Sequence, residues 1–178
     1  MKNKNFVFRV VMIFVSLALT GIDQLTKWLA VEFIKPEGTI PIIKFGETEW
    51  VNFTYCENTG MSFSLLEGQR FILIAVPILL IILVEWYIFS GKAEKKSMMF
   101  ALACLAGGGL GNLIDRVFLG YVVDFIDFRI INFAIFNFAD ICAVLGGFAF
   151  AIMLIIEDNK EAKEKKKQKS AESEDGNS

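Results

Sequence analysis

Histidine is absent from this chain of 178 residues, and cysteine and proline occur only three times each. Without histidine, histidine-based catalytic triads and histidine metal sites are excluded, and we expect neither a metal nor another cofactor. Cys104 and Cys142 fall inside apolar stretches, so the cysteines suggest no disulfide framework. Cys56 has no histidine to activate it as a nucleophile. Any chemistry must therefore come from other side chains, above all from carboxylates.

Long apolar runs dominate the sequence. Hydrophobic residues make up 54% of the chain and the mean hydropathy is +0.52, above what a soluble domain usually shows. A helix needs about 20 mostly apolar residues to cross about 30 Å of hydrocarbon. Four stretches meet or approach that length: about 6–29, 71–89, 98–117 and 133–156. We therefore predict an all-α membrane protein with four transmembrane helices in one domain, residues 1–156, and no separate soluble domain.

The first apolar run begins like a signal peptide, because Lys2, Lys4 and Arg9 precede or open it. The run continues into Asp23 and Lys27, however, without a small-x-small cleavage site followed by a mature domain. We therefore expect an uncleaved first helix.

Basic residues are distributed unevenly along the four-span scheme. Twelve of the 18 Lys and Arg residues lie at the N-terminus, in the loop between the second and third spans, and in the tail. Cytoplasmic segments carry an excess of Lys and Arg, so both termini are predicted to be cytoplasmic. The segments of about 30–70 and 118–132 then face outward.

Two segments are predicted to lie outside the membrane spans. Residues 36–56 contain β-branched and aromatic residues in partial alternation, which favours a small extracytoplasmic β-sheet between the first two helices. The tail of residues 157–178 is highly charged and is expected to be a disordered cytoplasmic segment. In the third span, the glycine-rich run of residues 106–111 favours close approach of helices in lipid.

Carboxylates and amides recur near the outer ends of the last two spans. Asp124 and Asp140 are the most informative, because an ionisable residue at a membrane segment is costly and usually functional. Two carboxylates that meet can share one proton, which suits acid–base chemistry such as hydrolysis. Asn112, Asp115 and Arg116 share one helix face by their i, i+3, i+4 spacing. Asn137 lies three residues before Asp140.

Spacing alone leaves alternatives open. Asp127 is as good a partner as Asp124 for the carboxylate pair. A purely structural salt-bridge network would join Asp115 with Arg116, or Asp124 with Arg129. Asp23 and Lys27, four residues apart, are also consistent with a simple interfacial ion pair.

Five polar motifs occur in a fixed order along the chain. They are Asp23-Gln24-Leu25-Thr26-Lys27, Glu57-Asn58-Thr59-Gly60, Gly111-Asn112-Leu113-Ile114-Asp115-Arg116, Val123-Asp124-Phe125 and Phe136-Asn137-Phe138-Ala139-Asp140. This set resembles bacterial lipoprotein signal peptidase, also called signal peptidase II, over about residues 8–156. The resemblance implies an aspartic endopeptidase of the bacterial cytoplasmic (inner) membrane, with its active site near the outer face. Such an enzyme removes the signal peptide from diacylglyceryl-modified prolipoproteins, cleaving before the lipidated cysteine.

The resemblance also assigns roles to residues. It implies that Asp124 and Asp140 form the catalytic pair, which demotes Asp127. It further implies substrate-binding roles for Asn58, Asn112, Arg116 and Asn137, and supporting roles for Asp23, Lys27 and Asp115. The chain departs from the family pattern at Met61-Ser62-Phe63, where two alanines often precede the aromatic residue; this departure concerns local packing and not the catalytic pair.

Two other classes of protein compete with this interpretation. A small proton- or ion-coupled transporter also carries intramembrane carboxylates. Its proton relay needs groups spread across the membrane depth, whereas the carboxylates of this chain cluster near one face. An assembly factor without enzymatic activity would use the glycines and charges for helix packing alone. The expected partners are lipid-modified prolipoproteins and the lipid bilayer, not nucleic acid, and the protein is expected to be a monomer.

Overall fold

The computed structural model describes residues 2–60, 68–93, 95–131 and 133–175. In this part of the chain, four helices are long and apolar enough to cross a membrane. They are α1 (Lys2–Leu29), α2 (Arg70–Phe89), α3 (Lys96–Phe118) and α4 (Phe138–Asp175). A π-helical turn, η1 (Ala30–Ile34), continues α1. The prediction of four membrane helices is confirmed. The departure from the family pattern at Met61 lies outside the described residues.

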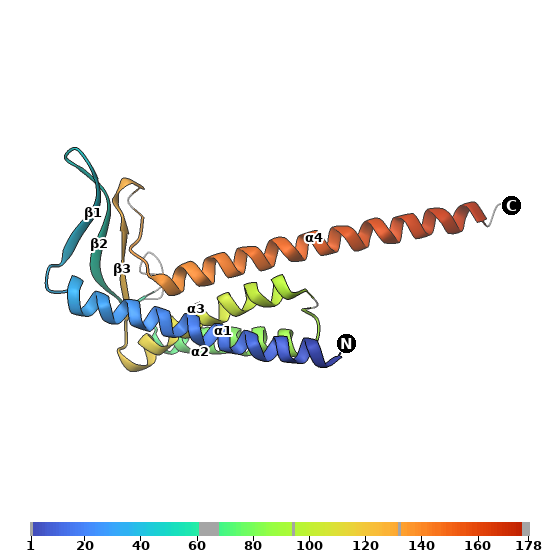
Figure 1. The fold of residues 1–178 in the computed structure, drawn as a ribbon, viewed down its shortest axis with the longest axis horizontal. Coiled ribbons are helices and arrows are strands. Elements are labelled where there is room, and N and C mark those ends of the chain that lie inside the picture. The colour runs from blue at the N-terminus through green and yellow to red at the C-terminus, as the bar shows by residue number, and fades with distance from the viewer. Residues whose placement is uncertain (1, 61–67, 94, 132, 176–178) are drawn as a thin grey trace.

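Helix α3 is the centre of the bundle and contacts α1, α2 and α4 (Figure 1). Small residues allow this close packing, as the glycine-rich run predicted. A Cβ atom on Gly107 would lie 2.8 Å from the Ser16 carbonyl oxygen of α1. A Cβ on Gly108 would collide with the Ala139 carbonyl oxygen of α4. Glycine at these two positions therefore brings the backbones of α1 and α4 against α3.

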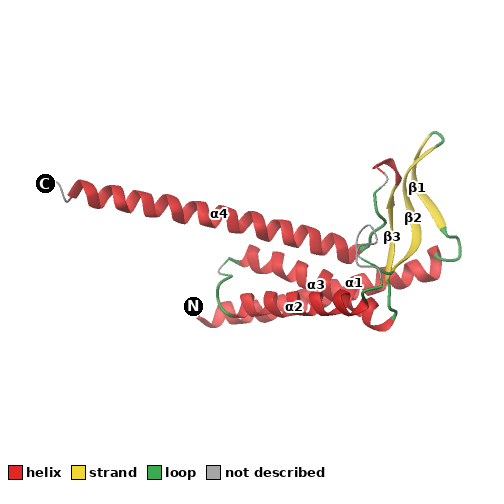
Figure 2. Ribbon diagram, turned by 180° about the vertical axis from the view of Figure 1, so that it is seen from behind, coloured by secondary structure: helices red, strands yellow, loops and turns green. Residues whose placement is uncertain are grey.

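A three-stranded antiparallel sheet lies across one end of the bundle (Figure 2). Its order is β1 (Thr39–Phe45), β2 (Thr48–Asn58) and β3 (Val122–Phe128). The first two strands confirm the sheet predicted between the first two helices. Strand β3 comes from the segment between α3 and α4, which was predicted to face outward but not to form a strand. It places Asp124 beside Cys56 of β2 in the ladder.

The sheet is joined to the end of the first helix by an apolar cluster. Ala30 and Ile34 of η1 are buried against Val123 and Phe125 of β3. Phe53 of β2 completes the contact, with its ring centroid 6.1 Å from that of Phe125. Burial of apolar area is worth about 25 cal/mol per Å², so this cluster fixes the strand that carries Asp124.

Two boundaries differ from expectation. Helix α4 begins at Phe138 rather than near Phe133, because Phe136 forms a β-bridge with Ile126 of β3. The tail, expected to be disordered, continues α4 as helix to Asp175. Its composition explains the difference, since Ala, Glu and Lys are strong helix formers and the tail consists largely of them. The start of α1 and the far end of α4 lie at the end of the bundle opposite the sheet (Figure 1).

Candidate active site

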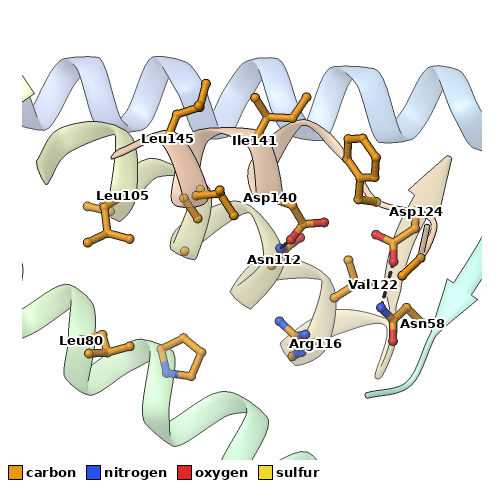
Figure 3. Close-up of a pocket in the computed structure, with 18 of the residues that line it drawn as sticks. Asn58, Leu80, Leu105, Asn112, Arg116, Val122, Asp124, Asp140, Ile141 and Leu145 are labelled. Atoms are coloured by element: carbon orange, nitrogen blue, oxygen red, sulfur yellow. Dashed lines mark hydrogen bonds between the residues drawn. The ribbon is translucent and has the colours of Figure 1, made fainter. Parts of the chain in front are cut away.

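Asp124 is the third residue of β3 and points toward the start of α4 (Figure 3). Its side chain is buried, with 1% of the residue exposed. The Asn58 Nδ2 group donates a hydrogen bond to Asp124 Oδ2 at 2.9 Å. The Asn137 Nδ2 group donates to Asp124 Oδ1 at 2.6 Å. Both carboxylate oxygens are therefore held by amide donors from two different segments.

Asp140 occupies the third position of α4 and forms a capping box with Asn137, the residue before the helix. The Asn137 Oδ1 atom accepts from the Asp140 backbone N–H at 3.0 Å. In return, Asp140 Oδ2 accepts from the Asn137 backbone N–H at 3.1 Å. Such reciprocal bonds satisfy N–H groups that have no partner inside the helix. Because Asn137 Oδ1 is used in this way, its Nδ2 group is left to face Asp124.

Asn112 connects this pair to the other polar groups. Its Nδ2 donates to Asp140 Oδ1 at 2.8 Å, and its Oδ1 accepts from Asn137 Nδ2 at 3.0 Å. The Lys27 ammonium donates to the same Asn112 oxygen at 2.9 Å. Lys27 also pairs with Asp23 at 2.8 Å and with Asp115 at 2.9 Å. Asn112 thus connects the pair of aspartates to the buried ionic cluster of Lys27, Asp23 and Asp115.

Burial raises the pKa of Asp124 to about 7. The hydrogen bond from Asn58 opposes this rise, the negative charge of Asp140 adds to it, and the hydrogen bond from Asn137 opposes it. A carboxyl group with a pKa near neutrality can hold a proton while a neighbouring carboxylate stays ionised, which is the arrangement acid–base hydrolysis requires.

Arg116 of α3 lies on the cavity side of the site near Asn58 (Figure 3). Its Nη2 donates to the Gly60 carbonyl oxygen at 2.9 Å, and the Gly60 N–H donates to Asn58 Oδ1 at 3.0 Å. Arg116 therefore braces the loop that presents Asn58 to Asp124. With this contact, one connected network joins all nine predicted site residues, namely Asp23, Lys27, Asn58, Asn112, Asp115, Arg116, Asp124, Asn137 and Asp140.

The structural alternatives drawn from spacing differ from the observed pairs. Asp115 pairs with Lys27 rather than with Arg116. Arg129 pairs with Asp127 at 3.1 Å rather than with Asp124. Asp127 also accepts from Thr54 at 2.8 Å, and its odd separation from Asp124 along β3 turns the two side chains to opposite faces of the strand. Asp23 and Lys27 do form an ion pair, but it is buried rather than interfacial.

A cavity with mostly apolar walls adjoins the two aspartates. This cavity of about 540 Å³ is lined by Asp124 and Asp140 and by side chains of α2, α3 and α4, including Leu80, Leu105 and Leu145. Figure 3 shows Leu80 of α2 on the side opposite Ile141 and Leu145 of α4. The cavity therefore offers two carboxylates at the end of an apolar compartment. Among the described residues, no group of three or more acidic or cysteine side chains is arranged to hold a metal ion.

Two contributors were not singled out from the sequence. Gln24 Nε2 donates to Asp115 Oδ1 at 2.9 Å and to the Gly111 carbonyl oxygen at 3.1 Å. A Cβ on Gly111 would collide with the Asp23 carboxylate, so glycine is what lets this carboxylate reach α4. Gln24 adjoins Asp23 in the sequence, but its partners on α3 are 87 or more residues away and no local pattern reveals them.

Comparison with known proteins agrees with this architecture. Residues 15–156 match the family model described as Signal peptidase (SPase) II. The lipoprotein signal peptidase of Caldanaerobacter subterraneus subsp. tengcongensis is 38% identical over 135 residues, which is 75% of this chain and 88% of the relative. That of Enterococcus faecalis is 36% identical over 164 residues, 88% of this chain and 94% of the relative.

A solved structure shares the fold. A bacterial membrane enzyme determined by the in meso method at 2.3 Å resolution superposes with a TM-score of 0.76 and 29% identity, covering 84% of this chain and 90% of that one. A second enzyme, determined by the same method at 1.9 Å, gives a TM-score of 0.67 at 30% identity, over 81% of this chain and 92% of that one. Together with the family match and the membrane architecture, these likenesses show that the chain belongs to the signal peptidase II family of membrane peptidases.

Proposed function

We propose that this protein is an aspartic endopeptidase that removes the signal peptide from diacylglyceryl-modified prolipoproteins, cleaving just before the lipidated cysteine. Asp124 and Asp140 are the proposed catalytic residues. The observation that carries the proposal is the bridge between them: Asn137 binds both aspartates, at the polar end of an apolar cavity. The relatives named lipoprotein signal peptidase support the choice of substrate.

The two carboxyl groups divide the acid and base roles. Burial raises the pKa of Asp124 to about 7, so Asp124 is the proposed acid that holds the proton, and Asp140, which is less buried, is the proposed base. Asp140 takes a proton from water as the water oxygen attacks the scissile carbonyl carbon, and Asp124 donates its proton to the carbonyl oxygen. Collapse of the resulting tetrahedral diol breaks the C–N bond. Asp140 then protonates the departing amine, and Asp124 recovers its proton from the diol.

Neighbouring polar groups position the peptide. Arg116 and Asn58 line the cavity beside Asp124 and are proposed to hold the substrate backbone. Asn112 and Asn137 keep the two carboxylates oriented while the peptide binds. Such positioning converts binding into an effectively intramolecular reaction and lowers the barrier.

The apolar lining of the cavity fits a substrate that lies in the membrane. Buried acyl chains add about 0.8 kcal/mol of membrane affinity per CH₂ and would hold the scissile bond at the depth of the aspartates. The test is cleavage of two precursors in the same lipid vesicles, one with a diacylglyceryl cysteine and one with an unmodified cysteine. We expect the lipidated precursor to be cut and the unmodified one to be cut poorly or not at all. Equal kcat/KM for both would remove the lipid requirement.

The proposed orientation places the sheet and the aspartates at the outer face of the membrane, with both termini in the cytoplasm. The distribution of Lys and Arg supports it, as does the position of the start of α1 and the far end of α4 opposite the sheet (Figure 1). In a background without native cysteines, Glu47→Cys in the β1–β2 turn should react with an impermeant thiol reagent from outside. Lys95→Cys should react only from inside. The reverse pattern would put the aspartates on the cytoplasmic side.

A further inference from the structure

Lys27 of α1 is 3% exposed, and its ammonium group has three acceptors within hydrogen-bonding distance. They are Asp23 Oδ2 at 2.8 Å, Asp115 Oδ2 at 2.9 Å and Asn112 Oδ1 at 2.9 Å. An ammonium group has three N–H donors, so each donor has one partner. No donor is left for a substrate, and Lys27 acts only through these three neighbours.

Two of these neighbours hold the backbone immediately before the aspartates. Asp115 Oδ2 accepts the Val123 backbone N–H at 3.1 Å, one residue before Asp124. Asp23 Oδ1 accepts the Ala139 backbone N–H at 2.9 Å, one residue before Asp140. The same ammonium therefore anchors, through one carboxylate each, the strand that carries one aspartate and the helix that carries the other.

The third neighbour sets the direction of an amide. Because Asn112 Oδ1 accepts from Lys27, the Asn112 Nδ2 group faces Asp140 Oδ1 and donates to it at 2.8 Å. Asn137 Nδ2 also approaches Asn112 Oδ1, but its two hydrogens are shared with Asp124 Oδ1 at 2.6 Å and the Val123 carbonyl oxygen at 3.3 Å. Lys27 is thus the dedicated donor that keeps Asn112 from turning its oxygen toward the Asp140 carboxylate.

We propose that Lys27 is a positioning residue that sets the geometry of the Asp124–Asp140 pair from α1, through Asp23, Asp115 and Asn112. This inference rests on the proposed catalytic role of the two aspartates. It assigns Lys27 a role beyond neutralising buried charge, because the position of both aspartates depends on its hydrogen bonds.

The test compares three variants in detergent-solubilised, folded protein. Lys27→Met removes the three donors. Lys27→Met with Asp23→Asn also removes one negative charge, so the net charge of Lys27, Asp23 and Asp115 returns to its native value, while the bond to Asn112 stays absent. Ser16→Ala is the matched control: it removes a buried hydrogen bond between α1 and α3, from Ser16 Oγ to the Ala103 carbonyl oxygen, away from the aspartates.

Cleavage kinetics give the first readout. We expect kcat per folded molecule to fall about 100-fold or more in both Lys27 variants with little change in KM, since a misplacement of about 1 Å can cost that much. Ser16→Ala should keep its kcat. If the charge-restored double variant regains native kcat, Lys27 serves only to balance charge and the proposal is overturned.

A second readout does not depend on activity. In protein labelled with ¹⁵N-asparagine, the side-chain amide resonance of Asn112, assigned by its loss in Asn112→Asp, should shift in both Lys27 variants and stay in place in Ser16→Ala. An unchanged Asn112 resonance would overturn the proposed positioning whatever the protein cleaves. Failure of the proposed aspartic mechanism would instead show as activity retained in Asp124→Asn, with the Asn112 shift still present in the Lys27 variants.

Discussion

The two sides of α3 are built differently. Toward α1 and α4, Gly107 and Gly108 allow contact between backbones, and Gly111 leaves room for the Asp23 carboxylate of the buried polar network. Toward α2, Gly109 faces Ile81 with ordinary van der Waals space, and the cavity lies on this side. The contrast shows how one helix serves two needs. Close packing keeps polar groups at fixed distances, while looser packing leaves volume for the proposed substrate.

The largest effect is expected at the polar end of the tightly packed side. Asp124→Asn and Asp140→Asn should each reduce cleavage roughly 10³-fold or more while leaving folded, membrane-inserted protein, because the shared proton requires both carboxyl groups. Cleavage of a lipidated precursor in vesicles measures this. Asp127→Asn is the control on the opposite face of β3 and should cost less than about tenfold, since its partners are structural. Near-native turnover in either of the first two variants would rule out the aspartic mechanism.

Next in size is a change to the packing itself. Gly108→Ala should force α4 away from α3, because the added Cβ meets the Ala139 carbonyl oxygen and lies 2.8 Å from the Ala143 backbone nitrogen. Overpacking of this kind costs about 1–3 kcal/mol, and the accompanying shift of Asp140 should lower kcat about 100-fold.

Gly109→Ala is the matched control for Gly108→Ala on the loosely packed side. Its Cβ would lie 3.5 Å from Ile81 Cγ1, so the thermal midpoint and kcat should stay close to native. Equal losses in both variants would mean that the two sides of α3 are packed alike.

The pH dependence of stability should report the burial of Asp124. Its folded-state pKa of about 7 lies above the ordinary value of 3.8, so the folded protein binds this proton more tightly than the unfolded chain does. The resulting stabilisation is full below about pH 4 and is lost as the pH rises through 7. Each pH unit between the two values corresponds to about 1.4 kcal/mol, so the loss amounts to a few kcal/mol. Unfolding in detergent across this range should show a smaller decline in Asp124→Asn than in the native protein.

The smallest effect is expected at the cavity wall. Leu80→Trp should fill part of the cavity between α2 and α4 and raise KM about tenfold with kcat and stability near native, since steric changes in apolar pockets are worth about 1–3 kcal/mol. Leu83→Trp, on the same helix but outside the cavity lining, is the control. If both variants raise KM equally, the cavity is not the substrate site.

The sequence predicted the parts of this architecture that depend on local composition. Hydropathy identified the four spans because a membrane helix must be apolar along its length. Strand β3 was missed because Val122–Phe128 is short and largely buried on both faces, so it shows no clean alternation. The Asn137–Asp140 capping box was visible only as a pair three residues apart, since the predicted helix began near Phe133.

The candidate site also contains parts that the sequence predicted and parts that it did not. Motif order and resemblance selected nine residues of the network but not Gln24, and spacing could pair Lys27 only with Asp23. Its bonds to Asp115 and Asn112 come from a helix about 85 residues further along the chain. Contacts between helices depend on how the helices pack against one another, so they could not be predicted from a single sequence.

The bond between Asp23 and the Ala139 backbone N–H bears on how the protein is made. It joins α1 and α4, the first and the fourth of the described membrane helices along the chain. A ribosome that has released only the first three helices has produced neither Asp140 nor the residue that Asp23 holds. The nascent chain therefore carries no complete pair of aspartates, and the proposed proteolytic activity would begin only once synthesis has passed the fourth helix and that helix has docked. The order of synthesis would then keep the incomplete protein from acting as a protease.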